Sequence, residues 1–294
     1  PALKGGVIAI GNFDGVHRGH RHVIAEARRL AAGRPVLVFT FEPHPRSFFQ
    51  PDKPLFHLCD FAGKVRLLAA AGVDAVAVAA FDHAFAALGC EAFADETLGA
   101  WLGASHVVIG RDFHYGAGRS GDAETLRAAG ARLGFGVTEA QPKAVDGVTV
   151  SSSAIREALS LGDLATANRL LGHAWFVTAE VIHGEKMGRQ LGYPTANLRL
   201  PPQTALRHGI YAVKIGFDGL WHDGVASFGR RPTFDNGAPL LEVHVFDFKG
   251  DLYGRTVDVA FAGFIRDEEK FDSLEALIRQ MDDDSLKARA ILAA

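Results

Sequence analysis

The sequence predicts two domains, an α/β domain built on a parallel sheet and then a small antiparallel β-barrel or sandwich with a terminal helix. From residue 7 to about residue 171, short apolar runs alternate with longer stretches rich in Ala, Leu and Arg. After residue 172, apolar and polar residues alternate in strand-like runs between turn residues, and the last segment returns to helical spacing. We therefore expect domains at residues 1–171 and 172–294.

Five short apolar runs are the expected strands of the first domain, at residues 7–10, 36–41, 73–78, 106–109 and 135–138. Helical stretches between such runs are typical of parallel strands joined by crossovers. Three loops begin where an expected strand ends, at Gly11, Glu42 and Gly110. Because the carboxyl ends of parallel strands share one edge of a sheet, we expect one crevice to collect these loops.

The second domain has five expected strands, at residues 175–182, 211–217, 224–228, 240–248 and 256–261. Their alternation and the turn residues between them predict antiparallel pairing. In the tail, Asp272 and Glu275 fit a capping box. Apolar residues follow at helical spacing, namely Leu274, Leu277, Ile278 and Met281, so a terminal helix is expected.

The composition is that of an ordinary globular protein. Of the 294 residues, 48% are hydrophobic and 22% are charged, which is enough to form a core in each of two domains. A net charge of −3 with scattered Lys and Arg disfavours general nucleic-acid binding. Cys59 and Cys90 lie far apart, so no disulfide framework or cysteine zinc site is expected. No apolar run reaches the roughly 18 residues of a membrane span, and we expect a cytoplasmic protein.

The decapeptide Gly-Asn-Phe-Asp-Gly-Val-His-Arg-Gly-His, residues 11–20, follows the first apolar run and precedes a helical stretch. A strand that enters a helix through a glycine-rich turn directs backbone N–H groups and the positive end of the helix dipole toward an anion. The glycine spacing fits neither a P-loop nor a dinucleotide-binding motif. His17 and His20 are three residues apart, so both can donate to a phosphate whose negative charge grows in a transition state.

Other members of the decapeptide are expected to bind the nucleotide or its phosphates, namely Gly11, Asn12, Phe13, Asp14 and Gly19. Asn12 and Asp14 are expected to position ligand or metal from the turn. The alternative for Asp14 is that its carboxylate only stabilises the turn.

A second candidate for phosphate binding lies at residues 150–156, where the chain again enters a helical stretch. Ser152 and Ser153 can cap the helix and bind phosphate oxygens. Arg156 in the first turn offers a fork of donors suited to phosphate. The alternative is that the serines are a helix cap and nothing more.

Residues 188–198 read Gly-Arg-Gln-Leu-Gly-Tyr-Pro-Thr-Ala-Asn-Leu. Thr195 and Asn197 are two residues apart, so in an extended backbone both side chains lie on one face. Both supply oxygens of the kind that Mg²⁺ accepts when it also holds nucleotide phosphates. Gly188 and Gly192 allow a phosphate to approach the backbone closely. The alternative is a polar turn without a ligand.

Glu242 lies within residues 240–246, a run that is expected to be a strand with apolar residues on both faces. A carboxylate is costly there unless it is paired or used in chemistry. Such a carboxylate can accept the proton of an alcohol that attacks the γ-phosphate of ATP. The alternative is a structural ion pair with an arginine.

These motifs together resemble the bacterial bifunctional riboflavin kinase/FAD synthetase family, and the resemblance covers essentially the whole chain. The decapeptide matches the family motif at every fixed position, and residues 41–45, 110–116, 151–156 and 188–198 continue the likeness. Two stretches depart from the family pattern, Ser153 where Thr is frequent and residues 226–229, which read Ala-Ser-Phe-Gly. The resemblance implies a Rossmann-like nucleotidyltransferase sheet followed by a riboflavin kinase barrel.

The resemblance also implies two reactions. The second domain transfers phosphate from Mg-ATP to the 5′-hydroxyl of riboflavin, with Glu242 as the general base, and the first domain transfers AMP from ATP to FMN. His17, His20, Ser152 and Arg156 are the implied donors to the transferring phosphates. The implied walls and anchor of the flavin site are Pro43, Pro45, Phe49, Phe93 and Asp112. The resemblance further implies that the terminal helix helps to cover the flavin of the kinase.

Two other interpretations stay open at this point. In the first, only one half is catalytic and the other is a flavin-binding regulatory module. In the second, the chain is a nucleotide- or RNA-binding module on an α/β scaffold. That second interpretation accounts for the glycine turn but leaves Thr195, Asn197 and Glu242 without a role.

Overall fold

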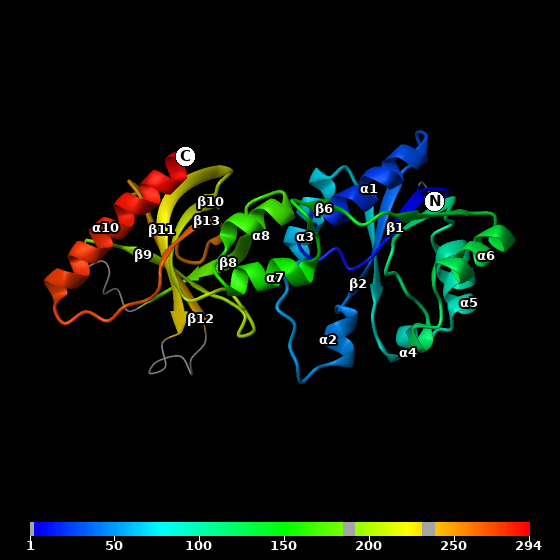
Figure 1. Cartoon of the computed structure of the whole chain (residues 1–294), viewed down its shortest axis with the longest axis horizontal. Coiled ribbons are helices and arrows are strands. Elements are labelled where there is room, and N and C mark those ends of the chain that lie inside the picture. Colours follow the sequence, from blue (N-terminus) through cyan, green and yellow to red (C-terminus); the bar gives the residue numbers. More distant parts are fainter. Residues whose placement is uncertain (1–2, 185–191, 231–238) are drawn as a thin grey trace. The chain divides into compact units, whose positions relative to one another are not determined.

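The computed structural model describes residues 3–184, 192–230 and 239–294, and the chain divides into two compact units (Figure 1). The first unit contains Pro1–Leu55 and Phe61–Ser151, and the second contains Phe56–Asp60 and Ser152–Ala294. A five-residue segment from the first half of the sequence therefore belongs to the second unit. Across the described part of the chain, no helix combines the length and apolar composition needed to span a bilayer.

A parallel five-stranded sheet forms the centre of the first unit, in the order β3-β2-β1-β4-β5. Its strands are β1 (Val7–Ile10), β2 (Val36–Glu42), β3 (Ala75–Ala80), β4 (His106–Gly110) and β5 (Gly136–Ala140). The order reverses its direction on the two sides of β1, so the loop after β1 lies at the switch point where α/β sheets bind ligands. The decapeptide is that loop.

Alternate residues of the strands pack on opposite faces of this sheet. Val7, Ala9 and Val38 share one core with Ile24 of helix α1 and Leu68 of helix α3. The next residues along the same strands form a second core with the π-helical segment η1 and with α6. The helices of this unit are α1 (Arg18–Ala31), α2 (Pro45–Phe49), α3 (Phe61–Ala70), α4 (His83–Ala86), α5 (Cys90–Ala92), η1 (Phe93–Trp101), the 3₁₀ turn η2 (Ala117–Arg119) and α6 (Ala123–Leu133).

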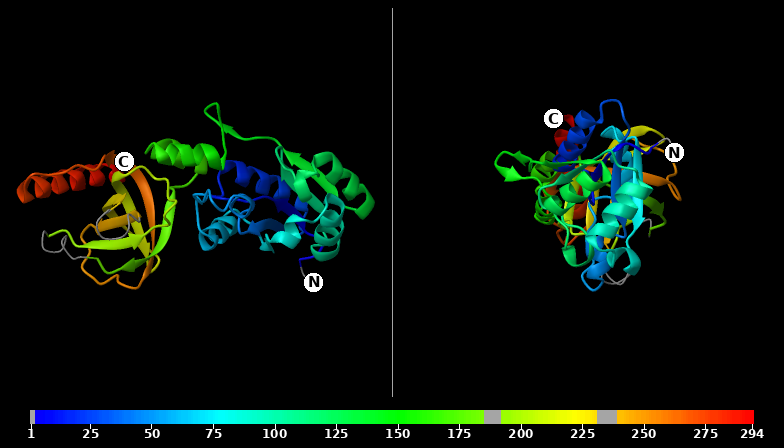
Figure 2. Two further views of the ribbon diagram at one scale, coloured as in Figure 1. Left: turned by 90° about the horizontal axis from the view of Figure 1, so that it is seen from below. Right: turned by 90° about the vertical axis from the view of Figure 1, so that its right-hand side faces the viewer.

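The second unit is a closed six-stranded antiparallel barrel, in the order β10-β11-β12-β9-β8-β13. Its strands are β8 (Phe176–Ile182), β9 (Thr195–Arg199), β10 (Gly209–Phe217), β11 (Leu220–Arg230), β12 (Pro239–Val245) and β13 (Thr256–Arg266). Helices α7 (Ser152–Ser160) and α8 (Leu164–Leu171) precede it, and α10 (Leu274–Ala293) follows. Figure 2 shows α10 beside the barrel, where it contacts β10, β11 and β13.

The segment 56–60 is held in the second unit by buried contacts. The indole Nε1 of Trp175 donates to the carbonyl of Leu58 at 2.8 Å, and the Trp175 ring meets Phe56 edge to face. Trp175 is 1% exposed. A buried indole N–H requires an acceptor, so this loop completes the environment of the residue that precedes the barrel.

The predicted sheet and barrel are confirmed, with shifts at the edges of elements. The run at 73–78 becomes β3 at Ala75–Ala80, two residues later. Strand β9 includes the extended stretch expected at Thr195 and Asn197 but was not among the expected strands. The two-stranded hairpin of β6 (Ala144–Val145) and β7 (Val148–Thr149) was not expected. The terminal helix is present, but its cap is Ser273, whose side chain accepts from the N–H of Ala276, rather than Asp272.

Candidate active sites

The decapeptide forms a tight, buried turn at the carboxyl end of β1. The N–H of Gly11 donates to the carbonyl of Phe39 at 3.1 Å, and the Thr40 hydroxyl donates to the carbonyl of Asn12 at 3.2 Å. Phe13 and Val16 have positive φ angles of 50° and 41°, and both side chains are buried. A non-glycine residue holds such a conformation only where its surroundings fix it, and this turn is therefore rigid.

The two histidines of the decapeptide are stacked at the start of α1. His17 is the N-cap of the helix, and its Nδ1 accepts from the backbone N–H of His20 at 3.1 Å. The two rings lie 3.5 Å apart and are nearly parallel. A Cβ at position 19 would lie 3.1 Å from the His17 ring, so glycine there leaves room for the stack.

Two buried polar atoms of this turn lack a hydrogen-bond partner among the described residues, Asn12 Oδ1 and His20 Nδ1. Native structures rarely leave such atoms unsatisfied, and where they do a ligand is a common reason. Burial holds the pKa of His20 well below its usual range, and the neighbouring His17 and the positive charge of Lys64 act in the same direction. His20 is therefore neutral at physiological pH.

The predicted flavin-binding residues of the first unit lie in several environments. Pro43 and Pro45 lie at the end of β2 and the start of α2, and the ring of Phe49 on α2 is 64% exposed. Asp112 is exposed in the loop that follows β4. Phe93 is 3% exposed and packs in the core against Phe39, so its contact with a flavin stays a prediction.

Ser152, Ser153 and Arg156 lie in the first turns of α7, which belongs to the second unit. The Nε of Arg156 donates to the carbonyl of Phe56 at 2.6 Å, a residue of the same unit. This contact fixes the position of the guanidinium. Joint action of these three residues with the histidines of the first unit stays a prediction.

The barrel brings Glu242 and Asn197 together across two strands. Glu242 on β12 lies directly opposite Asn197 on β9 and opposite Ser227 on β11, so the three side chains share a face. The expectation that both faces of this strand are apolar is wrong. Leu241, Val243 and Val245 are buried in the barrel core, whereas Glu242 and His244 are half-buried and line a pocket.

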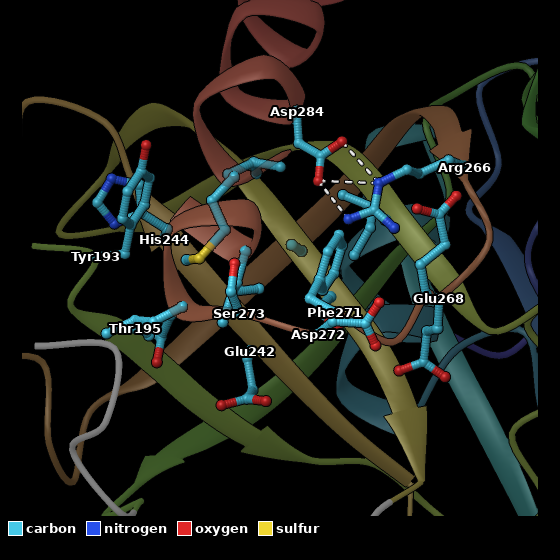
Figure 3. Close-up of a pocket in the computed structure, with 18 residues that line it drawn as sticks. Tyr193, Thr195, Glu242, His244, Arg266, Glu268, Phe271, Asp272, Ser273 and Asp284 are labelled. Atoms are coloured by element: carbon cyan, nitrogen blue, oxygen red, sulfur yellow. Dashed lines mark hydrogen bonds and ion pairs between the residues drawn. The ribbon is translucent and has the colours of Figure 1, made fainter. Parts of the chain in front are cut away.

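This pocket, of about 660 Å³, lies between the barrel strands and α10 (Figure 3). Its strand side includes Thr195, Ser227 and Glu242, and its helix side includes Leu277 and Met281. A pocket of this size with an apolar side and a few polar groups is typical of small-molecule sites. Thr195 also lines a neighbouring cavity of about 70 Å³ beside the loop 248–253, so it stands at the border of the two spaces.

A buried ion pair connects β13 to the middle of α10 at the edge of the pocket (Figure 3). Arg266 binds Asp284 through two nitrogens, at 2.9 and 2.7 Å, and the side chains are 15% and 4% exposed. Tyr193 donates from its hydroxyl to Asp282 on the same helix. Partial desolvation raises the pKa of Glu268, another lining residue, and the negative charge of Glu242 adds to this.

Comparison with protein families gives one match for each half of the chain. Residues 1–154 match the FAD synthetase family, and residues 171–292 match the riboflavin kinase family. The chain belongs to the family of bifunctional riboflavin kinase/FMN adenylyltransferases. The predicted domain boundary after residue 171 stays a prediction, since the matches leave residues 155–170 between them.

Curated members of this family resemble the chain over its whole length. The bifunctional riboflavin kinase/FMN adenylyltransferase of Pseudomonas fluorescens is 42% identical, over 100% of this chain and 95% of the relative. The enzyme of the same name from Escherichia coli K12 is 42% identical over 97% and 92%. A crystal structure of a protein named macrolide-efflux protein, from Streptococcus pneumoniae, has a TM-score of 0.87 at 32% identity and covers 97% of this chain and 93% of that one.

Sequence reasoning missed several residues that line the barrel pocket or act on the decapeptide. Arg266, Asp284 and Glu268 line the barrel pocket, yet each is an ordinary polar residue in its own stretch of sequence. Tyr193 also lines it and lies within the motif at residues 188–198, but no role was predicted for its side chain. Lys64 was detectable from sequence. It lies one helical turn before Leu68, so a helix between the expected strands puts this lysine on the same side as an apolar residue. Gly188 lies outside the described residues, so its role stays a prediction.

Proposed function

We propose that this family member carries out two successive steps of flavin cofactor synthesis, one in each unit. The barrel phosphorylates riboflavin to FMN with ATP, and the parallel-sheet unit transfers AMP from a second ATP to FMN, which yields FAD and pyrophosphate. The observation that carries the proposal is that each unit holds its own built polar site, Glu242 with Asn197 in one and the stacked histidines in the other.

In the kinase reaction, the 5′-hydroxyl of riboflavin attacks the γ-phosphorus of ATP and ADP leaves. Glu242 lies in the pocket wall, where its carboxylate can accept the hydroxyl proton as the new O–P bond forms. Thr195 lines both the large pocket and the small cavity, which supports a role for its hydroxyl near the phosphates of ATP. The flavin lies in the large pocket beneath α10.

The metal of this reaction is Mg²⁺ that arrives with ATP. Thr195 and Asn197 fit this ion, because their side chains lie on one face of β9 and offer neutral oxygen donors. A Cβ at position 184 would lie 2.6 Å from the Asn197 amide, so glycine there leaves space for this side chain. Mg²⁺ neutralises charge on the phosphates when it is bound.

In the adenylyl transfer, a phosphate oxygen of FMN attacks the α-phosphorus of ATP in line and pyrophosphate leaves. No protein nucleophile is needed, so catalysis consists of alignment and charge neutralisation. His17 and His20, with the turn residues Asn12 and Asp14, supply the contacts at the carboxyl end of β1. Ser152, Ser153 and Arg156 add donors to phosphate, and Pro43, Pro45, Phe49, Phe93 and Asp112 contact the flavin.

The first test follows the flavins over time in the wild-type protein with riboflavin, ATP and Mg²⁺. We expect FMN to rise before FAD. The interpretation that one half only regulates the other predicts that FMN accumulates without FAD, or that added FMN is converted to FAD while riboflavin is not used. Either of these results would remove one of the two proposed activities.

Two substitutions separate the sites. His20→Ala should stop FAD formation while FMN accumulates, and Glu242→Gln should reduce FMN formation by at least about 100-fold while added FMN still yields FAD. Glu180→Gln, an exposed carboxylate on β8 of the same barrel, is the matched control and should leave both rates unchanged. Loss of both activities in either variant would contradict a two-site enzyme.

A further inference from the structure

Lys64 is a buried cation in the first unit. Its side chain lies on α3, is 5% exposed, and places Nζ 2.7 Å from Oε1 of Glu42, whose own side chain is 37% exposed. Lysines are almost never fully buried unless they are paired. Within the described part of the chain Glu42 is the acceptor for this ammonium, which has three N–H donors. The pair is thus a buried cation held by a partly exposed anion.

The pair lies on the decapeptide side of the sheet. Thr40 and Glu42 are two residues apart on β2, so their side chains share a face, and the Thr40 hydroxyl contacts the decapeptide carbonyl of Asn12. Four residues after Lys64 on α3, Leu68 packs in the same core as Phe13. The ammonium therefore stands at the carboxyl edge of the sheet, beside the turn that carries the histidines.

The electrostatic effect of Lys64 reaches that turn. Burial and the stacked His17 lower the pKa of His20, and the positive charge of Lys64 lowers it further. Among the described residues, the titratable groups that act on the His20 ring are His17 from the turn and Lys64 from α3. Glu42 is the counter-ion of Lys64. Asp14 is the other buried ionisable group of the decapeptide.

A purely structural role is a poor explanation for the buried charge of Lys64 and its pairing with Glu42. Removing two charges from water is expensive, and a neutral pair of similar volume often stabilises a protein as well or better. A fixed cation is useful where a polyanion binds, because attraction in a partly water-excluded site is stronger than in bulk water. The Asn12 and His20 atoms without partners lie in that same region.

We propose that Lys64 contributes to phosphate binding at the adenylyl-transfer site: its ammonium, held in place by Glu42, is a fixed positive charge that favours binding of the nucleotide phosphates at the decapeptide. The inference rests on the proposed adenylyl transfer in the first unit. The Lys64 ammonium acts on the phosphates together with the histidines, and Glu42 keeps it in position before the nucleotide arrives.

The test compares Lys64→Met, which removes the charge, with Lys64→Arg, which keeps it. FAD formation from added FMN isolates this site from the kinase. We expect KM for ATP to rise about tenfold in Lys64→Met, the size of one charge-assisted contact, and to stay within about threefold of wild type in Lys64→Arg. Lys4→Met is the matched control. Lys4 precedes the amino end of β1, is exposed, and donates to the carbonyl of Ala100.

A second measurement does not depend on turnover. The protonated fraction of the His20 imidazole, read by NMR at a fixed mildly acidic pH, should be larger in Lys64→Met than in wild type, because a repelling charge is gone. Lys64→Arg should resemble wild type. If Lys64→Met is too unstable, the variant Lys64→Met with Glu42→Gln replaces the pair by neutral groups and should show the same two changes.

The outcomes separate this proposal from the proposed function. If wild type makes no FAD from FMN, the proposed adenylyl transfer fails, and the NMR comparison still tests the electrostatic link. If wild type makes FAD, and folded Lys64→Met keeps the KM for ATP of wild type, Lys64 does not favour binding of the nucleotide phosphates and the proposal is wrong, whatever the protonation of His20.

Discussion

At the scale of single residues, the two histidines of the decapeptide have different tasks. The Nδ1 of His17 accepts a hydrogen bond from the backbone of His20, so in the neutral ring the proton sits on Nε2. His20 offers a buried Nδ1 without a partner among the described residues. Protonation of His17 at Nδ1 would break the helix cap, and protonation of His20 would add charge to a buried site that already faces Lys64.

One prediction concerns the stability of the first unit as the pH falls. The pKa of His20 is lower in the folded state than the usual value of about 6.5. Below about pH 6.5 the unfolded chain therefore binds a proton that the folded protein refuses, and the free energy of unfolding decreases as the pH is lowered. Urea unfolding at pH 7.5, 6.5 and 5.5 measures this. His20→Asn should flatten the dependence, and an equally steep dependence in that variant would contradict the assignment.

At the scale of elements, polar contacts decide how α10 packs on the barrel. Its sequence carries Asp282, Asp283 and Asp284 in succession, and helical geometry turns each to a different direction. Asp284 is buried against Arg266 of β13, whereas Asp283 is exposed and pairs with Lys287 on the helix itself. The helix also carries apolar residues into a small core with Ala212 and Phe246, so its position combines both kinds of contact.

These neighbouring aspartates provide a matched prediction. Asp284→Asn leaves Arg266 without its buried carboxylate and should lower the free energy of unfolding of the barrel by about 3 kcal/mol. It should also raise KM for riboflavin, because α10 covers the pocket. Asp283→Asn removes an exposed pair and should change stability by less than about 0.5 kcal/mol. Urea unfolding and kinase kinetics measure both effects, and similar losses in the two variants would contradict this account of the helix.

At the scale of the whole molecule, the two units are not two consecutive pieces of sequence. Residues 56–60 interrupt the first unit and belong to the second, where Leu58 accepts from Trp175. Asn168 of α8 bridges to the barrel as well, since it donates to the carbonyl of Phe261 and accepts from the N–H of Trp175. A chain segment of the first half thus helps to fold the unit that holds the kinase site.

Trp175→Phe tests this arrangement. The substitution removes the buried indole N–H that donates to the carbonyl of Leu58. We expect it to lower the stability of the second unit by about 1–3 kcal/mol, with a further loss from the reduced side-chain volume. Trp221→Phe is the control, since this ring is 54% exposed. Urea unfolding, with kinase activity as the probe, measures the stability of the second unit. Equal stability in the two variants would mean that the segment 56–60 contributes little to it.

Much of both candidate sites was predictable from local sequence. The decapeptide predicted a phosphate-binding turn because its glycines and paired histidines act within ten residues, and the structure keeps them in one turn. Thr195 and Asn197 were predictable as a pair because strand geometry alone puts them on one face. The flavin contacts of Phe49, Phe93 and Asp112 stay predictions. A single aromatic ring or carboxylate carries no local signal of its partner.

The sequence by itself determined the strand and helix pattern, the turn after β1 and the family of the chain, because these depend on neighbours along the chain and on motifs of fixed spacing. Only the tertiary structure decided which distant groups meet. It placed Glu242 opposite Asn197, buried Arg266 against Asp284, and set Lys64 on Glu42 beside the decapeptide. Such pairs depend on strand register and on packing between remote elements, and burial is a property of the assembled fold rather than of any one segment.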